Sequence, residues 1–433
     1  MTTVVIGGGW AGLAAAVELA AHNIPVTVVE ASRQLGGRAR ALRFGAAPLD
    51  NGQHVLLGAY RSFLRLLRTI GVAESQVLRR LPLDLRFLDG TSSRQLRAPR
   101  LPAPLNLLGA LAGMHGLRPW TRATALRMAI ALWRDDFDPG SDCTVAQYLD
   151  RHGQSSALVR ALWQPLCLAA LNTPVEQASG RLFARVLRET FFGSRSASDI
   201  LIPITDLGRC FPEPAREFVE RHGGSVRLAC RALAIDIDQN KVRAVRLEHD
   251  TLPADHVIVA TGVSASHALL HRHEAFSGIC ARLKRIKMHP ICTVYLQYPQ
   301  EVTLGREFVA LLGTTVQWLF DRGLLTGENG LIAAIISGPG RHMSMDSDTL
   351  LDLVTTELAR QFPHWPSPSA SKLVRERRAT FAATGEVDAA RPSFTTDVDG
   401  VWLAGDYTAT GFPATLEGAV SSGVECAQLI LKQ

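Results

Sequence analysis

The sequence predicts an α/β fold in which a discontinuous, Rossmann-like dinucleotide-binding domain is interrupted by an inserted mixed α+β domain. Two observations support this. A glycine-rich turn follows an apolar stretch near the first residue, and another apolar stretch near the far end finishes in Gly-Asp. The chain has 433 residues, of which 47% are hydrophobic, so it is long enough to bury more than one core. Two domains are therefore expected.

The first element is a strand over residues 4–6, which runs directly into the glycine-rich sequence GGGWAG. In this fingerprint Gly7 allows a tight turn, Gly9 lets the backbone approach a pyrophosphate, and Gly12 lets the next helix pack close to the sheet. Residues 13–20 are strong helix formers with small side chains. The amides that open this helix are expected to face the phosphates.

A second group of nucleotide contacts follows the next strand, which is predicted over residues 26–29. Glu30 closes that strand and can accept hydrogen bonds from a ribose diol. Beyond it, two flexible glycines and the guanidinium group of Arg38 can hold the same pyrophosphate from its other side. The predicted contacts in this half of the site are Gly7, Gly9, Ala11, Gly12, Glu30, Ala31, Gly36, Gly37 and Arg38.

The middle of the chain supplies more of the nucleotide-binding domain. The pattern there is a strand, then a hairpin over residues 232–236 and 242–247, then a buried strand that ends in Ala-Thr-Gly at 260–262. The remaining segments must build the substrate domain, first with helices and then with strands. We predict the nucleotide-binding domain over residues 1–58, 205–270 and 395–433, and the substrate domain over 59–204 and 271–394.

The C-terminal region carries a buried strand that ends in Gly405-Asp406, followed by a helix start near Thr415. Together with the two glycine motifs, this region resembles the FAD-dependent amine oxidases and phytoene-type desaturases. The resemblance implies an FAD cofactor whose ribityl chain is held by Asp406. It also implies that the last helix points its N-terminus at the flavin and that a three-stranded ribbon is inserted into the FAD domain. The cofactor contacts carried over in this way are Ala232, Gly405, Asp406, Thr415 and Leu416.

Three segments narrow the resemblance to one branch of that family. They are LDNGQH at 49–54, LWQPLCLAALNTP at 162–174 and GDYTATGFPATLEGAVSSG at 405–423. Together they resemble the hydroxysqualene dehydroxylases, the squalene-associated desaturase branch, over nearly the whole chain. In amine oxidases a lysine commonly precedes the strand that corresponds to residues 291–298. This chain has His289-Pro290 there, which weakens the amine hypothesis.

The resemblance implies a reductive reaction in which reduced FAD gives hydride to an allylic carbon as its hydroxyl leaves, yielding squalene and water. Hydroxide leaves poorly, so an acid or a strong hydrogen-bond donor must assist. We name His54 as the catalytic candidate because its loop is expected to pass near the isoalloxazine; Gly52 and Gln53 are expected to contact the flavin. The alternative is that His54 only packs against the flavin. Lesser candidates, each expected to hold backbone amides instead, are Asp50 and Glu417.

Two other functions stay open at this point. The first is oxidative desaturation of a long isoprenoid at the same site, with electrons flowing in the opposite direction. The second is a prenyl-lipid carrier like the Rab GDP-dissociation inhibitors, which share the fold without redox chemistry. The presence of Glu30, Arg38 and Asp406 argues against the carrier. For all three functions the apolar substrate domain predicts a long-chain isoprenoid partner.

Residues 101–117 carry no formal charge and are flanked by arginines on both sides. Prolines, glycines and polar residues interrupt this segment, so it does not suit a bilayer span, which needs about 20 apolar residues. Apolar surface with basic flanks suits a segment that lies in a membrane interface. The alternative is an ordinary core helix. We expect a cytoplasmic protein with peripheral membrane contact, and association with squalene-synthesis enzymes.

Other functional classes lack their motifs. The seven cysteines form no CxxC pair, so neither a zinc site nor a disulfide framework is predicted, and we expect no metal. The sequence has no GxSxG, GxxxxGK or HExxH motif, which argues against hydrolases, phosphotransferases and zinc proteases. Gly338-Pro339-Gly340 is predicted to be a turn because it lacks a third glycine. Net charge is +6, but no basic stripe with aromatic residues predicts nucleic-acid binding.

Overall fold

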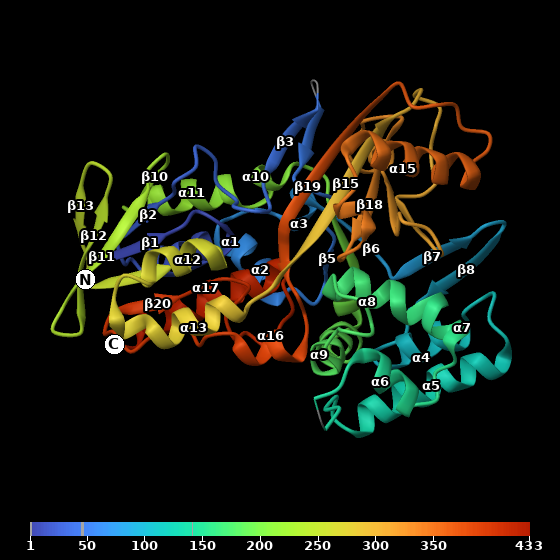
Figure 1. Ribbon diagram of the computed structural model, residues 1–433, viewed down its shortest axis with the longest axis horizontal. Coiled ribbons are helices and arrows are strands. Elements are labelled where there is room, and N and C mark those ends of the chain that lie inside the picture. The colour runs from blue at the N-terminus through green and yellow to red at the C-terminus, as the bar shows by residue number, and fades with distance from the viewer. Residues whose placement is uncertain (1, 45–46, 141) are drawn as a thin grey trace.

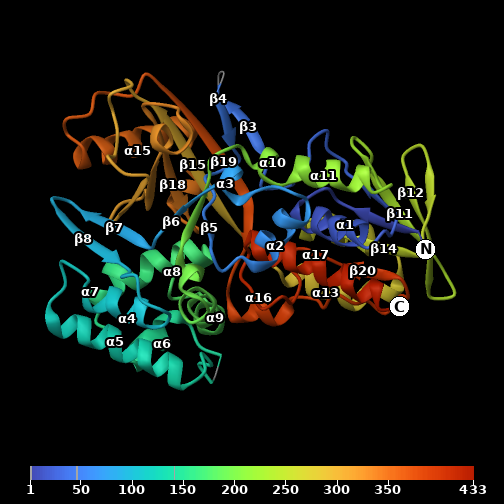
Figure 2. The same ribbon diagram turned by 180° about the vertical axis from the view of Figure 1, so that it is seen from behind.

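The computed structural model describes residues 2–44, 47–140 and 142–433 (Figure 1). The molecule is elongated. A parallel sheet wrapped by helices forms one end, and a second sheet with a helical layer beneath it forms the other. Both chain termini lie at the end that holds the parallel sheet, as the view from behind also shows (Figure 2).

The parallel sheet draws its five strands from three distant parts of the chain, and every neighbouring pair is parallel. The strand that runs into the first glycine motif lies at its centre beside the strand over residues 256–259, and the residues of both are buried. Parallel sheets need cover on both faces, and apolar helices supply it here. The order is β10 (Ser225–Arg227), β2 (Val26–Val29), β1 (Thr3–Ile6), β14 (His256–Val259) and β20 (Val401–Leu403). The predicted α/β fold is confirmed.

The first and last long helices, α1 (Trp10–Ala21) and α17 (Leu416–Leu431), pack directly against each other. Their backbones approach closely, because a Cβ added to Gly423 would lie 2.0 Å from the Ala11 carbonyl oxygen. This contact holds the two ends of the chain together. The other helices at this end are α2 (Arg61–Thr69), α10 (Leu207–Cys210), α11 (Pro212–Arg221), α12 (Val263–Leu270), α13 (Ser277–Arg285) and α16 (Gly385–Ala390).

The three-stranded ribbon expected between the parallel strands is present. It consists of β11 (Ala232–Asp238), β12 (Lys241–Leu247) and β13 (Thr251–Pro253), all antiparallel. Gln239 and Asn240 form its first turn with φ of 48° and 59°, the left-handed conformation that tight two-residue hairpins need. The ribbon extends from the end of the molecule where the termini lie.

A seven-stranded mixed sheet forms the upper part of the other end of the molecule. Its two longest strands, β15 (Met288–Gln297) and β19 (Ala370–Phe381), pair with each other and run toward the parallel sheet. One face is covered by α15 (Ser347–Gln361). The remaining strands are β18 (Leu331–Ser337), β17 (Trp318–Asp321), β16 (Phe308–Leu311), β7 (Asp84–Asp89) and β8 (Ser92–Arg97). The last two come from a part of the chain predicted to be mostly helical.

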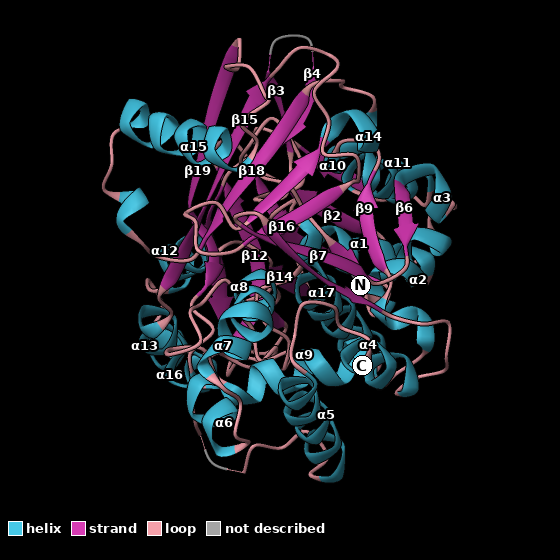
Figure 3. Cartoon of the chain, turned by 90° about the vertical axis from the view of Figure 1, so that its right-hand side faces the viewer, coloured by secondary structure: helices cyan, strands magenta, loops and turns pink. Residues whose placement is uncertain are grey.

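The helical layer lies below this sheet, and Figure 3 shows it from the side. The sequence predicts one helix over residues 156–171, but the structure has α7 (Ser156–Leu158), a π-helical turn η1 (Val159–Trp163) and α8 (Gln164–Leu171). Pro165 explains the interruption, because it has no amide hydrogen and its ring collides with the preceding turn of a regular helix. The other helices of the layer are α4 (Leu105–Ala112), α5 (Pro119–Arg134), α6 (Val145–Arg151) and α9 (Gly180–Phe191).

Short elements connect the two ends of the molecule. Leu56–Leu57 (β5) and Leu78–Leu81 (β6) pair on either side of Ile200–Pro203 (β9). Although α2 lies beyond the predicted boundary at residue 58, it packs against α17 in the core of the parallel-sheet end. The remaining elements are β3 (Ala41–Phe44), β4 (Ala47–Asp50), α3 (Glu74–Val77), α14 (Arg322–Thr326), and the 3-10 turns η2 (Arg195–Ser198), η3 (Glu274–Phe276) and η4 (Arg341–Met343). In the part of the chain described here, every helix is too short or too polar to span a bilayer.

Candidate flavin site

The turn after β1 and the first turn of α1 each have a position that only glycine can occupy. Gly7 has φ of +115°, and a Cβ there would lie 2.7 Å from the Ala260 carbonyl oxygen. A Cβ on Gly12 would lie 2.0 Å from the Gly7 carbonyl oxygen, which the tight packing of α1 on the sheet forbids. Gly9 differs. Among the described residues, its Cβ would meet only the Gly37 Cα, at 3.9 Å. Space therefore remains in front of Gly9.

The second glycine pair lies beside the first motif. Gly36 bridges to Gly9 in parallel fashion, and its amide donates to the Gly8 carbonyl oxygen at 2.9 Å. Gly36 and Gly37 have φ of +102° and +61°. A Cβ on Gly37 would approach the Gly9 Cα at 3.4 Å. The two motifs thus face each other without side chains at the start of α1, an arrangement that fits a pyrophosphate.

Glu30 is fixed at the end of β2 by backbone amides. Its carboxylate oxygens accept hydrogen bonds from Gly8 and Ser32, each at 2.7 Å. Carboxylate oxygens have further lone pairs, so Glu30 can still accept from ribose hydroxyls. The start of the ribbon lies beside it, because the Cys230 amide donates to the Glu30 carbonyl oxygen. Ala31 is exposed next to Glu30 and Ala232 is half-buried two residues after Cys230, so both predicted contacts lie at this end of the site.

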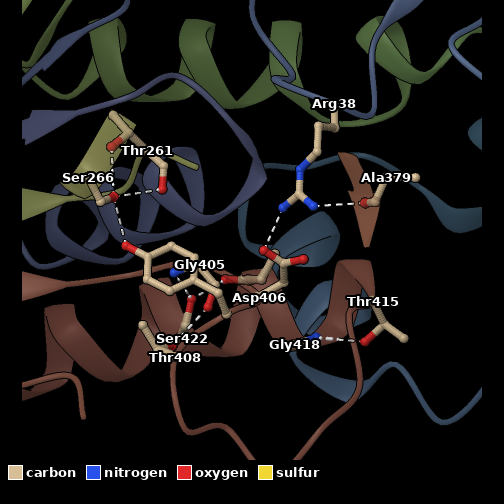
Figure 4. Close-up of polar contacts among 12 residues, drawn as sticks. Arg38, Thr261, Ser266, Ala379, Gly405, Asp406, Thr408, Thr415, Gly418 and Ser422 are labelled. Carbon is tan, nitrogen blue, oxygen red and sulfur yellow. Dashed lines mark hydrogen bonds and ion pairs between the residues drawn. The ribbon is translucent and has the colours of Figure 1, made fainter. Parts of the chain in front are cut away.

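Arg38 and Asp406 join the two chain ends directly (Figure 4). Nη2 of Arg38 lies 2.5 Å from Oδ1 of Asp406, and its Nη1 donates to the Ala379 carbonyl oxygen at 2.8 Å. Burial opposes the Arg38 charge, but the Asp406 carboxylate outweighs it and raises the guanidinium pKa. The pyrophosphate-side and ribityl-side residues expected from the sequence are therefore in contact.

The backbone before Asp406 is held in an unusual conformation. Gly405 has φ of +148°, and a Cβ there would lie 2.6 Å from the Tyr407 ring. The Gly405 amide donates to the Ser422 Oγ at 2.8 Å, and the Tyr407 hydroxyl pairs with the Ser266 Oγ at 2.9 Å. Burial raises the pKa of Tyr407, which keeps the phenol neutral. These contacts fix the direction in which the Asp406 side chain leaves its strand.

The N-terminus of α17 is capped by Thr415, whose Oγ1 accepts from the Gly418 amide at 3.1 Å (Figure 4). The other first-turn amides, beginning at Leu416, have no partner within the helix and suit an electron-rich ligand edge. Glu417 points elsewhere. Its carboxylate accepts from the Ser62 and Phe63 amides at 2.8 and 3.1 Å, and so caps α2.

Asp50 is the last residue of β4 and is buried. Its Oδ1 accepts from the Leu207 amide at 2.8 Å, at the start of α10, and its carbonyl oxygen accepts from the Tyr295 hydroxyl at 3.0 Å. Burial raises the pKa of Asp50 to about 7. Two residues later, Gly52 has φ of +103°, and a Cβ there would meet the buried, unpaired Thr293 Oγ1 at 3.4 Å. The loop after β4 thus lies over β15.

His54 has its Nδ1 2.9 Å from the Gly52 carbonyl oxygen. A carbonyl only accepts, so Nδ1 carries the hydrogen, and burial lowers the His54 pKa. The neutral ring then presents Nε2 as an acceptor. Gln53 is fixed beside it, because its Oε1 accepts from Arg322 Nη1 at 3.3 Å and its Nε2 donates to the His54 carbonyl oxygen. In this state the Nε2 of His54 can accept a hydrogen bond but has no proton to donate.

Asn172, in the Asn-Thr-Pro sequence, has a role that the sequence did not predict. It has φ of +49° at the end of α8, and its amide group donates to the Pro290 carbonyl oxygen and to the Thr380 Oγ1 at 3.0 and 2.9 Å. Its Oδ1 accepts from the Gly338 amide at 2.6 Å, and its carbonyl oxygen accepts from His289 Nδ1. One side chain therefore fastens the helical layer to β15, β18 and β19. An Asn just after an apolar helix is the sequence signal for such a cap.

The apolar substrate wall predicted from the sequence lies in the helical layer. A small cavity there is surrounded by hydrocarbon and aromatic side chains, and its volume is about 10 Å³, roughly one water-sized sphere. Among the described residues the expected channel is therefore closed at this point by side chains. The lining is Leu96, Leu107, Leu111, Ala129, Leu132, Leu162, Trp163, Leu166, Leu187, Phe191 and Phe192.

Known proteins are similar to this chain in sequence and in fold. The profile of the family described as flavin containing amine oxidoreductase matches residues 10–431. A hydroxysqualene dehydroxylase from Sinorhizobium fredii is 30% identical over 99% of this chain and 98% of its own. A 15-cis-phytoene desaturase from an Oncidium hybrid is 23% identical over 100% of this chain and 78% of its own.

Solved structures agree on the fold. Cyclohexylamine oxidase from Brevibacterium oxydans superposes with a TM-score of 0.74 at 19% identity, over 100% of this chain and 98% of that one. An oxidoreductase from Methanosarcina mazei gives 0.78 at 16% identity, over the whole of both chains. The fold and the site define an FAD-dependent oxidoreductase. The chain belongs to the flavin containing amine oxidoreductase family, and the hydroxysqualene dehydroxylases are among its full-length relatives.

Proposed function

We propose that this enzyme reductively removes the hydroxyl group of hydroxysqualene and releases squalene. The observation that carries the proposal is its similarity to three proteins named hydroxysqualene dehydroxylase, at 26–30% identity over 99% of the chain. The apolar lining of the helical layer supports the same class of substrate, since hydrocarbon walls suit an isoprenoid chain.

The proposed reaction balances as follows: the alcohol and reduced FAD give the hydrocarbon, water and oxidised FAD. One C–O bond breaks, one C–H bond forms, and the departing hydroxyl takes up one proton. FAD, when bound and reduced, supplies the hydride. The residues proposed to hold it are the glycines of both motifs, Glu30 and Arg38 at one end, and Asp406 with the first turn of α17 at the other.

Within this proposal His54 is the catalytic residue. Its Nε2 accepts the hydrogen of the substrate hydroxyl and so orients the C–O bond. Protonation at Nε2 turns the same ring into a donor that assists departure of the hydroxyl, while the Nδ1 hydrogen bond to Gly52 stays in place. Gln53, held by Arg322, keeps the loop that carries the ring in position.

The helical layer has a second role in the proposal. An allylic cation formed as the hydroxyl leaves would be short-lived in water, so a dry site protects it. The closed cavity must open for the substrate, so we propose that the side chains around it move when the substrate enters. We also propose a cytoplasmic location with peripheral membrane contact, and association with the enzymes that make the substrate.

Oxidative isoprenoid desaturation is the second candidate, because the 15-cis-phytoene desaturases also match at 22–23% identity. Membership of an oxidoreductase family argues against the lipid carrier. Anaerobic incubation of the reduced holoenzyme with hydroxysqualene, and of the oxidised holoenzyme with phytoene, separates the two candidates. Squalene in the first reaction supports our proposal. New conjugated double bonds in the second, with no squalene in the first, would replace it.

A further inference from the structure

The outer face of α5 exposes large apolar side chains. Trp120, Ile130 and Trp133 are 78%, 52% and 64% exposed. With Ala123 and Arg127 they recur every three or four residues, so they share one side of the helix. The opposite side is buried in the core through Thr124, Ala125, Met128, Ala129 and Leu132. Isolated exposed apolar residues are ordinary, but two tryptophans and an isoleucine along one helix face indicate a contact surface.

This face lies at the edge of the molecule. In Figures 1, 2 and 3, α5 forms the lower border of the helical layer, away from the seven-stranded sheet. The neighbouring helix α4 adds two exposed side chains near its start, Leu101 and Leu105, at 43% and 50%. Arg122 ties the two helices together by donating to the Ala112 carbonyl oxygen at 3.0 Å. A flat partner can therefore approach α5 without meeting the flavin end of the molecule.

The charge around α5 is uneven. The helix contains no acidic residue. Exposed Arg118 lies just before Trp120, and exposed Arg127 lies about halfway along the helix between Trp120 and Trp133. At the other end, Arg134 pairs with Asp135 at 3.1 Å, and Asp136 and Asp138 follow. The Trp120 end is thus basic, and the Trp133 end is acidic even though Arg188 also pairs with Asp136 at 3.5 Å. Arginines beside an exposed tryptophan match an anionic lipid surface, where the indole lies at the headgroup level.

The same two helices separate this face from the apolar cavity. The cavity is lined on this side by Leu107 and Leu111 of α4 and by Ala129 and Leu132 of α5. The exposed tryptophans lie on the opposite side of α5. The sequence suggested residues 101–117 as the membrane-facing segment. In the structure the middle of that segment is core, with Asn106, Leu107, Ala110, Leu111 and Met114 buried. The exposed apolar surface continues instead along α5.

From these observations we infer that the outer face of α5 docks on an anionic lipid bilayer, with the Trp120 end set deepest. The inference rests on the proposed function and deepens it, since a water-insoluble substrate then passes from the bilayer between α4 and α5 into the cavity behind them. The surface is defined as Trp120, Arg127, Ile130 and Trp133, with Arg118 at its edge.

The test is co-sedimentation of the holoenzyme with vesicles of phosphatidylcholine alone or mixed with phosphatidylglycerol, at low and high salt. The double variant Trp120→Ser/Trp133→Ser is compared with Leu324→Ser, which removes an exposed leucine on α14, outside this surface. A charge pair, Arg118→Glu/Arg127→Glu, is compared with Arg216→Glu on α11, away from the helical layer. Flavin content and circular dichroism establish that each variant is folded.

We expect wild type and both controls to bind vesicles that contain phosphatidylglycerol, less so at high salt. The tryptophan variant should partition at least about tenfold more weakly, because two indoles no longer leave water. The charge variant should lose the preference for anionic lipid. Equal binding of all variants, or no binding by wild type, would overturn the inference. So would a wild-type dimer in solution that the tryptophan variant dissociates, since a second copy would then be the partner.

Failure of the membrane-docking inference and failure of the proposed reaction give different experimental results. With substrate dispersed in detergent, the tryptophan variant should make squalene as fast as wild type, and it should be slower only when the substrate is supplied in vesicles. If wild type also makes no squalene in detergent, the proposed function is contradicted. The vesicle-binding result would still test the docking surface independently.

Discussion

Nη2 of Arg38 lies 2.5 Å from Oδ1 of Asp406, although 368 positions separate them in the chain. The pair links the residue expected at the pyrophosphate to the residue expected at the ribityl chain. It is supported by α1 and α17, whose backbones touch where Gly423 meets Ala11. The flavin site is thus a product of the whole fold, and the beginning and end of the chain must both be in place before it exists.

The first prediction concerns this pair. Asp406→Ala should release FAD and abolish turnover, because it removes both the proposed acceptor for the ribityl chain and the partner of Arg38. Arg38→Gln should weaken FAD binding less and destabilise the fold by about 1–2 kcal/mol, since the Asp406 carboxylate is largely buried and loses its counterion. Flavin absorbance after gel filtration measures the first effect and urea unfolding the second. Asp352→Ala on exposed α15 is the control, and a full yellow spectrum in Asp406→Ala would contradict the assignment.

The two glycines at the start of α1 should respond differently to alanine. In Gly9→Ala the new methyl group points into open space within the chain, so the apoprotein should fold normally and bind FAD about tenfold more weakly. In Gly12→Ala the methyl group collides with the Gly7 carbonyl, so stability should fall by about 2–3 kcal/mol. Thermal melts of the apoproteins and FAD titrations distinguish the two. Unchanged FAD affinity in Gly9→Ala would place the pyrophosphate elsewhere.

Asp50 should make stability depend on pH. Its pKa is about 7 in the folded protein against 3.8 for an ordinary side chain, so the native state binds the proton more tightly. The resulting stabilisation is complete below 3.8 and is lost as pH rises through about 7. The nearby Arg322 charge lowers the Asp50 pKa, whereas the charges of Asp206 and Glu328 raise it.

Asp50→Asn removes this dependence and keeps an oxygen for the Leu207 amide. Relative to wild type, the variant should gain about 1–3 kcal/mol of unfolding free energy as pH rises across that window. Urea unfolding at several pH values measures the difference. A constant difference between the two proteins would show that Asp50 is already ionised in the native state.

His54→Asn should retain FAD but lower kcat by about a hundredfold, as expected when a proton donor is lost. Burial lowers the His54 pKa below 6.5, so the donor form accumulates only at acid pH. Wild-type kcat should therefore rise as pH falls below 6.5, and the variant should lack that rise. His249→Asn, at an exposed site, is the control. Identical pH profiles in wild type and His54→Asn would reduce His54 to a packing role.

Much of the flavin end could be predicted from the sequence because its signals are local. Gly7 and Gly12 are demanded by a turn and by one helix contact, and the hairpin is indicated by two adjacent strand patterns over residues 232–236 and 242–247. The strand that ends in Gly405-Asp406 is short, apolar and followed by a capped helix. Each of these features depends on a few neighbouring residues, so it can be recognised in the sequence without the tertiary structure.

The features that the sequence did not predict depend on distant partners. Asn172 meets Pro290, Gly338 and Thr380, and nothing near it in the chain indicates those contacts. The link from Arg322 to Gln53 is equally remote. The composition of residues 101–117 suggested a lipid-facing segment, but tertiary packing buries its middle and leaves the outer face of α5 exposed instead. The closed state of the apolar cavity likewise depends on side chains from four α-helices, the π-helical turn η1 and a strand.

The most direct test of the central claim is a single turnover. The holoenzyme is reduced without oxygen, mixed with hydroxysqualene, and followed by flavin absorbance while the product is measured by mass spectrometry. We expect oxidised flavin to return as squalene appears, one molecule for each flavin. Flavin that stays reduced in the presence of the alcohol, or squalene formed without flavin oxidation, would contradict it.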